Sequence, residues 1–312
     1  MAHEGEIKGR APRVLVVYKK STYQRLVRER KNTRLSALLE AGDIVADQLI
    51  EAHEAHASTI EEARKALQHL GVKALFRYRA EAAAANDVDL VVSIGGDGTL
   101  LWASHLVGGE TPMLAINSAP DASVGHYCAA GKGQVETFLG AALEGRLKAT
   151  RLERMQITRD GQLLSKRILN DALFCHPCPA ATARYLLYFG DEVEEQKSSG
   201  LWVGPAAGST AALRSAGGQV LPLSSAKLQF VVREPYQHQK AYQHIRGLFG
   251  SQTRFALRSK MDSARLYLDG THRVHEVEIG AELCFSLSPE PLYVLGLREA
   301  LAQRGQKRSP RS

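Results

Sequence analysis

Apolar and polar residues alternate in blocks along the first third of the chain, and the blocks switch between strand and helix patterns. Short apolar runs predict strands at 14–18, 73–78, 89–94 and 112–117. Longer segments with apolar residues every three or four positions predict helices over 35–55, 58–70 and 99–107. Ser58 and Glu61 form a capping-box pattern, and Gly71 stands where the second helix would stop. Strands that alternate with helices predict a parallel sheet, either open or a half-barrel.

After about residue 150 the pattern becomes mainly β. Extended segments bounded by turn residues are expected at 152–158, 166–174, 183–189, 227–232, 264–268, 274–279 and 282–287. Asp160-Gly161 and Asp269-Gly270 predict tight turns between neighbouring strands. The sequence therefore predicts α/β plus β: a Rossmann-like domain over 1–130, a β-rich sandwich domain over 131–290, and a return of 291–312 to the first domain.

Charge and hydropathy narrow the class of protein. The chain of 312 residues has a net charge of +7, yet its basic residues are scattered, and only the tail from Arg304 to Arg311 is a basic run without acids. Scattered charge does not favour a nucleic-acid partner. No apolar run is long enough to span a membrane, and residues 1–10 match neither a signal peptide nor a transit peptide. We expect a cytoplasmic protein with small-molecule ligands.

The four cysteines do not predict a metal centre. Cys175 and Cys178 have the C-x-x-C spacing of zinc and redox sites, but the chain has no second such pair. A thioredoxin-like context is also missing around this pair. We therefore expect reduced, structural thiols and no metal bound by the protein.

The most informative motif is Gly95-Gly96-Asp97-Gly98-Thr99, which directly follows a buried-type strand and opens a helix. Glycines let phosphate oxygens approach backbone N–H groups at the start of a helix. The alternative is that Asp97 only caps that helix at Thr99. The carboxyl end of a strand is where open α/β sheets place ligands, which favours a functional role. The spacing is not that of a P-loop.

Two further segments carry candidate chemistry. Residues 198–218 are small and hydroxyl-rich, and predict a strand, a Gly-Ser-Thr turn and a short helix that could bind a polar ligand or form a tight packing corner. Asn170-Asp171 places an amide and an acid at the end of an apolar run, which alone could be any strand end.

Together these motifs resemble the NAD kinase family. The resemblance rests on Gly95 to Thr99, on Asn170-Asp171, and on the Gly-Ser-Thr-Ala and Ser-Ala-Gly-Gly sequences within 208–218. It covers about residues 13–290. The segments 117–120, 125–128, 176–180 and 232–235 are similar to the plant NADH kinase and animal mitochondrial NAD kinase branch.

The resemblance implies a kinase that moves the γ-phosphoryl group of ATP, bound with Mg²⁺, to the 2′-hydroxyl of NAD(H), between an α/β and a β domain. Asp97 would take or orient the hydroxyl proton. The implied ATP-phosphate contacts are Gly95, Gly96, Gly98 and Thr99, to which Lys19, a cation just after the first strand, is added. The implied NAD(H) contacts are Asn117, Asn170, Asp171, Thr210, Ala211 and Ser215. A homodimer or higher homo-oligomer is expected.

The chain departs from many bacterial relatives at three positions: Ser199 replaces an aspartate, Asp171 a glutamate, and Ala212 an aromatic residue. Loss of one carboxylate and one ring predicts a weaker preference for the cationic oxidised nicotinamide. We therefore expect NADH to be accepted at least as well as NAD⁺.

Other functions explain less of the sequence. A lipid kinase of the diacylglycerol or sphingosine type shares the Gly-Gly-Asp-Gly-Thr motif, but its acceptor needs a long apolar slot and a membrane-docking surface. A phosphofructokinase-like enzyme does not explain residues 170–171 or 198–218. A dinucleotide sensor without activity would be favoured only if Asp97 were missing.

Overall fold

The computed structural model describes residues 11–83, 87–120, 123–236 and 242–308, with side chains up to residue 304. These residues form two units. Unit 1 contains the chain up to residue 150 and again from residue 293, and unit 2 contains residues 151–292. Residues 131–150, which the sequence assigned to the β-rich domain, group with unit 1. The segment from 293 on rejoins unit 1, and residues 309–312, the end of the basic tail, lie outside the described part.

Unit 1 is built on an open sheet that, among the described residues, has seven strands in the order β2-β1-β3-β4-β19-β6, with β5 also paired to β4. Its strands are β1 (Arg13–Tyr18), β2 (Lys73–Tyr78), β3 (Leu90–Gly95), β4 (Met113–Asn117), β5 (Ala130–Gly131), β6 (Ala149–Leu152) and β19 (Leu292–Leu295). Strands β1 to β5 and β19 run parallel. The predicted parallel sheet is confirmed in its open form, and the four predicted strands agree with β1 to β4 within one residue.

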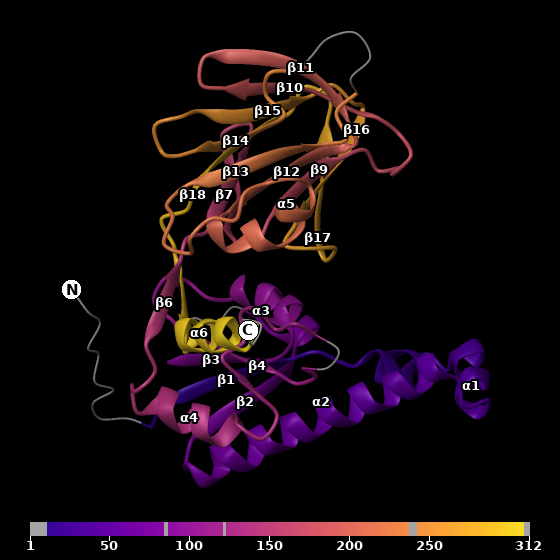
Figure 1. The fold of residues 1–312 in the computed structure, drawn as a ribbon, viewed down its shortest axis with the longest axis vertical. Coiled ribbons are helices and arrows are strands. Elements are labelled where there is room, and N and C mark those ends of the chain that lie inside the picture. The colour runs from indigo at the N-terminus through magenta and orange to yellow at the C-terminus, as the bar shows by residue number, and fades with distance from the viewer. Residues whose placement is uncertain (1–10, 84–86, 121–122, 237–241, 309–312) are drawn as a thin grey trace. The chain divides into compact units, whose positions relative to one another are not determined.

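Helices cover both faces of this sheet, as Figure 1 shows: α2 and α4 lie on one face, and α3 and α6 on the other. Alternate residues of the strands pack against α2 and α4, including Val14, Val92 and Ile116, because successive side chains of a strand point to opposite faces. The helical elements are η1 (Gln24–Glu29), α1 (Thr33–Glu40), α2 (Ile44–His69), η2 (Arg79–Glu81), α3 (Asp97–Ser104), α4 (Val135–Leu143) and α6 (Leu297–Arg308).

The predicted helices over 35–55 and 58–70 are wrong in their boundaries. The first helix ends before residues 41–43, where Gly42 has φ +64°. The next helix, α2, then continues through residue 58 without interruption. Asn32 caps α1 by accepting the Leu35 N–H at 2.9 Å, and Asp43 caps α2 by accepting the Val45 N–H at 2.9 Å. The Ser58 capping-box pattern is therefore helix interior, whereas the stop at Gly71, with φ +67°, is confirmed.

Unit 2 consists, in its described residues, of two antiparallel six-stranded sheets. One sheet has the order β11-β10-β15-β18-β7-β8, with β7 (Met155–Arg159), β8 (Gln162–Ile168), β10 (Ala183–Phe189), β11 (Glu192–Ser198), β15 (Phe255–Ser259) and β18 (Glu282–Leu287). The other has the order β14-β13-β12-β9-β16-β17, with β9 (Ala172–Cys175), β12 (Gly200–Pro205), β13 (Leu228–Arg233), β14 (Arg246–Phe249), β16 (Ser263–Leu268) and β17 (Arg273–Glu278). One buried cluster draws residues from both sheets, among them Phe174, Tyr185, Phe230 and Phe255. The predicted β-rich sandwich is confirmed.

Two predicted extended segments are interrupted. Residues 152–158 divide between the end of β6 and β7, and residues 166–174 divide between β8 and β9. The second interruption places Asn170 and Asp171 in the connection between two strands. After β12 the chain forms η3 (Ala206–Thr210) and α5 (Ala212–Ser215), as the small-residue segment predicted.

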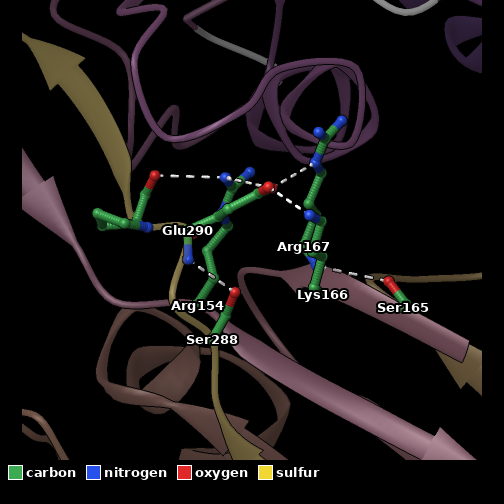
Figure 2. Close-up of polar contacts among 7 residues, drawn as sticks. Arg154, Ser165, Lys166, Arg167, Ser288 and Glu290 are labelled. Atoms are coloured by element: carbon green, nitrogen blue, oxygen red, sulfur yellow. Dashed lines mark hydrogen bonds and ion pairs between the residues drawn. The ribbon is translucent and has the colours of Figure 1, made fainter. Parts of the chain in front are cut away.

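A buried arginine joins the points where the chain enters and leaves unit 2, as shown in Figure 2. Arg154 is 0% exposed; its Nε donates to Glu290 O at 2.7 Å and its Nη2 to Pro291 O at 3.3 Å. The Glu290 carboxylate also pairs with Lys166 at 2.5 Å and Arg167 at 3.0 Å. Burial, and next the charge of Arg167, lowers the pKa of Arg154 to about 10, so it stays charged at neutral pH.

No helix in the described part of the chain is long and apolar enough to cross a membrane.

Candidate active site

The Gly-Gly-Asp-Gly-Thr motif lies at the carboxyl edge of the unit 1 sheet. All six residues of β3 are buried, and α3 begins at Asp97 with Gly96 as its N-cap. A Cβ atom at Gly95 would lie 2.2 Å from Thr99 Oγ1 and 2.8 Å from Thr99 Cβ, so this position requires glycine; one at Gly96 would lie 2.3 Å from Ser123 Oγ, a hydroxyl that can rotate away. A Cβ at Gly98 would meet nothing within 4 Å. The third glycine therefore borders open space.

Asp97 does not cap its own helix. One carboxylate oxygen accepts the His126 N–H at 2.8 Å and the other accepts the Tyr127 N–H at 2.8 Å. The predicted alternative, a helix cap at Thr99, is therefore wrong. Two backbone donors hold the carboxylate from a loop 29 and 30 residues away, which leaves its remaining lone pairs for another partner.

The ends of β1 and β4 lie beside the end of β3, where the Gly-Gly-Asp-Gly-Thr motif begins, because these strands are paired in the sheet. Tyr18 is the partner of Ile94 across β1 and β3, and Asn117 is the partner of Gly95 across β3 and β4. Lys19, the next residue after β1, is half-buried, and its pKa is lowered by burial and then by Arg79. A cation held in partly dehydrated surroundings beside a second cation favours an anionic ligand.

Asn117 has a clear role in the loop that follows β4. Its Nδ2 donates to Ser123 O at 2.8 Å, and its Oδ1 accepts the Ala119 N–H at 3.2 Å. The predicted dinucleotide contact of Asn117 stays a prediction beside this structural role.

A buried histidine joins the ends of β1 and β4. His56 of α2 is 3% exposed; its Nε2 lies 2.6 Å from Lys19 O and its Nδ1 lies 2.7 Å from Ser118 Oγ. A carbonyl only accepts, so Nε2 carries the proton and Nδ1 accepts from the serine hydroxyl. Burial lowers the pKa of His56 to about 4, and the ring is therefore neutral at neutral pH.

In unit 2, Asn170 and Asp171 occupy a loop fixed by Asp269. The Asp269 carboxylate accepts the N–H groups of Leu169 at 3.0 Å, Asn170 at 2.6 Å and Asp171 at 3.2 Å. Asp171 is 6% exposed, and burial, with the Asp269 charge as the second cause, raises its pKa to about 7. The loop thus presents an amide and an acid that is partly protonated at neutral pH.

Glycines of the small-residue segment pack directly on this loop. A Cβ at Gly204 would lie 2.4 Å from Asn170 O, and one at Gly208 would lie 1.6 Å from it. Ser209 is buried and donates to Ala206 O at 2.7 Å. The packing-corner interpretation therefore accounts for Gly204, Gly208 and Ser209. Thr210 and Ala211 are half-buried and Ser215 is exposed, so their assignment to the ligand stays a prediction.

A pocket of about 330 Å³ opens beside Asp171. Trp202, Leu173 and Tyr267 line it from adjacent positions on β12, β9 and β16. The guanidinium carbon of Arg233 lies 5.9 Å from the Trp202 ring centroid. Its further lining is mostly apolar or sulfur-bearing and includes Cys175, Pro177, Cys178, Pro179 and Ala181. A flat ring suits such a site, because aromatic faces bind rings by stacking.

The four cysteines of the chain form no disulfide with one another. Cys128, Cys175, Cys178 and Cys284 are free. Burial, followed by the Asp97 charge, raises the pKa of Cys128 to about 12, so its thiol stays protonated. Within the described residues, no group of three or more His, Cys, Asp or Glu side chains is placed to hold a metal ion.

Comparison with known proteins identifies the family. A family model for the ATP-NAD kinase N-terminal domain matches residues 14–147. The chain is 35% identical over 273 residues to a probable NADH kinase of Oryza sativa subsp. japonica, which covers 80% of this chain and 84% of the rice protein. The chain belongs to the NAD kinase family.

Other relatives agree. An NADH kinase of Arabidopsis thaliana is 34% identical over 243 residues, with 70% of this chain and 75% of that protein covered. The crystal structure of an NAD kinase from Archaeoglobus fulgidus in complex with ATP shares the fold, with a TM-score of 0.67, 18% identity, and coverage of 95% and 98% of the two chains. Yeast NADH kinase complexed with NADH gives a TM-score of 0.65 at 14% identity, with 97% and 90% covered.

As a member of this family, the chain is an ATP-dependent NAD(H) kinase that produces NADP(H). Several residues that shape its two candidate sites were given no role from the sequence, although Trp202 lies in the candidate segment 198–218: His56, Trp202, Tyr267, Arg233 and Asp269. Asp269 was noticed only as a turn residue before Gly270. Arg233 fell within a segment that resembled the NADH kinase branch, without a role.

Proposed function

We propose that Asp97 takes or orients the proton of the 2′-hydroxyl on the adenosine ribose of NAD(H), while that hydroxyl attacks the γ-phosphorus of ATP. The observation that supports this proposal is that two backbone N–H groups hold the Asp97 carboxylate at the carboxyl edge of the sheet. A fixed carboxylate with free lone pairs suits a general base. The hydroxyl oxygen gains the phosphoryl group and ADP leaves, so the products are NADP(H) and ADP.

The donor is ATP with its Mg²⁺, bound as one substrate. Gly95, Gly96, Gly98 and Thr99 are proposed to lie around its phosphates, and the open space at Gly98 supports this. Lys19 is proposed to balance phosphate charge. Phosphoryl transfer depends mainly on positioning and charge neutralisation, which these groups and the nucleotide's own metal ion would supply.

The acceptor dinucleotide is proposed to bind Asn170, Asp171, Thr210, Ala211, Ser215 and Asn117. We assign the nicotinamide ring to the pocket between Trp202 and Tyr267. Arg233 is cationic, Asp171 is only partly ionised at neutral pH, and Ser199 of the lining is uncharged. A cationic ring gains little from such a pocket, which supports NADH as an acceptor at least as good as NAD⁺.

The test compares initial rates of NADP⁺ formation from NAD⁺ and NADPH formation from NADH with Mg-ATP. We expect Asp97→Asn to lower kcat by at least about 10²-fold, the scale of general-base catalysis. Full activity in this variant would overturn the role of Asp97. A specificity constant for NADH far below that for NAD⁺ would overturn the proposed acceptor preference.

Arg233→Gln tests the assignment of the pocket. Removal of the cation beside Trp202 is expected to raise kcat/KM for NAD⁺ relative to NADH. The adenine ring is the same in both dinucleotides, so an equal change for both would show that the pocket binds another part of the acceptor.

We also infer that the enzyme is a homodimer or higher homo-oligomer, as the family resemblance implies, and that it acts in the cytoplasm. Light scattering after size-exclusion chromatography would test the first point, and fractionation of the source cells the second.

A further inference from the structure

Arg304 of α6 binds the loop that holds Asp97. Its Nη1 donates to Gly125 O at 2.8 Å and to His126 O at 3.0 Å, and its Nη2 donates to Cys128 O. The arginine is half-buried and lies 179 residues beyond Gly125 in the sequence. A planar guanidinium can satisfy several carbonyls at once, which an ammonium group cannot match in geometry.

The peptide groups that accept from Arg304 are the same ones that donate to Asp97. Gly125 O and His126 N belong to one planar peptide group, and His126 O and Tyr127 N belong to the next. Each group therefore receives a hydrogen bond from the guanidinium on its oxygen and donates one to the carboxylate from its nitrogen. Hydrogen bonds in such chains polarise and strengthen one another.

The loop has little freedom between these contacts. Gly125 has φ +60°, and a Cβ there would lie 2.4 Å from Asn117 Nδ2, so the turn passes close to the end of β4. Tyr127 and Cys128 are buried. Arg304 thus fixes the carbonyl side of a segment whose N–H side fixes Asp97.

We propose that Arg304 is a positioning residue of the kinase reaction, acting on the Asp97 carboxylate through the two peptide groups of residues 125–127. The proposal rests on the proposed role of Asp97. Catalysis by a carboxylate requires its oxygen within a few tenths of an ångström of the productive place, and loss of such support is costly in rate.

The experiment measures kcat, KM for Mg-ATP, KM for NADH and the thermal unfolding temperature of full-length Arg304→Ala and Arg304→Lys. We expect the alanine variant to lose about 10²-fold in kcat, with both KM values changed less than about threefold. The lysine variant keeps the positive charge, and its kcat is expected to lie between those of the alanine variant and the wild type. Arg298→Ala, an exposed change on the same helix, is the control and is expected to match wild type.

Two further measurements separate positioning from simple stabilisation. Guanidinium ion added to Arg304→Ala, below denaturing concentration, is expected to restore part of kcat. In an Asp97→Asn background, Arg304→Ala is expected to add little further loss, because residues that act as one unit are not additive.

Each outcome decides the proposal. Wild-type kcat in folded Arg304→Ala overturns it, as do losses that multiply in the double variant. If the alanine variant does not fold, Arg304→Lys decides: reduced kcat at an unchanged unfolding temperature supports the proposal, and wild-type kcat overturns it. Full activity of Asp97→Asn would overturn the role of Asp97 and that of Arg304 together, whereas an inactive Asp97→Asn beside a fully active Arg304→Ala would overturn only the second.

Discussion

The aspartates near the two candidate sites differ in the groups that surround their carboxylates. Asp97 accepts from two backbone N–H groups and keeps lone pairs for its proposed contact with the substrate, whereas Asp269 accepts from three and holds the loop of Asn170 and Asp171. Asp171 is buried near Asp269 and is partly protonated at neutral pH. Residue type alone does not assign these tasks; the donors around each carboxylate do.

Replacement of Asp269 by Asn is expected to weaken acceptor binding. An amide has one oxygen, so at least one of the three N–H groups would face an NH₂ group and lose its acceptor, at a cost of about 1–3 kcal/mol. We expect a lower unfolding temperature and a higher KM for NADH, with KM for Mg-ATP unchanged. Asp262→Asn, at an exposed position of the same unit, is the control. An unchanged KM for NADH would contradict the positioning of Asn170 and Asp171 by Asp269.

His56 makes a separate prediction about acid stability. Its pKa falls from 6.5 to about 4 in the folded protein, so the unfolded chain binds the extra proton more readily. The stabilisation by the neutral ring is complete above about pH 6.5 and is lost as the pH falls towards 4, by up to about 3 kcal/mol. Urea unfolding of His56→Gln at pH 7 and pH 5 should show a smaller acid-induced loss than wild type. An equal loss in both proteins would contradict this prediction.

At the scale of elements, sequence patterns predicted the strands of unit 1 well because each is a short buried run with clear limits. The predicted helix boundaries were wrong because the break between α1 and α2 was placed at the wrong residues. Gly42-Asp43, a stop followed by a cap, was the local signal that was missed, and Ser58-x-x-Glu61 was a capping pattern inside a helix. Asp269 and Arg304 lie about 100 and 180 residues along the chain from the residues that they bind, and a local sequence pattern carries no information about such distant partners.

The glycines at the two candidate sites predict a contrast between Gly98 and Gly208. Gly98→Ala adds a methyl group in open space within the first turn of α3, so we expect unchanged or slightly higher stability but a KM for Mg-ATP raised about tenfold or more. Gly208→Ala would place Cβ 1.6 Å from Asn170 O, and we expect a clear loss of stability. Thermal unfolding and ATP saturation curves check both. An unchanged KM in Gly98→Ala would mean that the phosphates do not approach this position.

At the scale of the whole molecule, the buried Arg154 connects the two segments where the chain enters and leaves unit 2. Arg154→Leu would leave the Glu290 and Pro291 carbonyls without this donor, and each buried acceptor left unsatisfied costs about 1–3 kcal/mol. Chemical unfolding should show this loss. Arg151→Ala, which removes the pair between an exposed arginine and the half-buried Glu153, should change stability by less than about 1 kcal/mol. A small effect of Arg154→Leu would show that the cluster in Figure 2 is dispensable for folding.

Unit 1 consists of two segments of the chain that are separated by unit 2, and this separation affects the order in which its sheet can form during protein synthesis. Strand β19 lies between β4 and β6 in the sheet, and α6 carries Arg304, yet both come from the last part of the chain. A ribosome that has translated only as far as residue 291 has made nearly all of unit 2, but the unit 1 sheet still lacks an inner strand. The unit 1 sheet, and the proposed support of its catalytic carboxylate by Arg304, therefore cannot be completed until all of unit 2 has been translated.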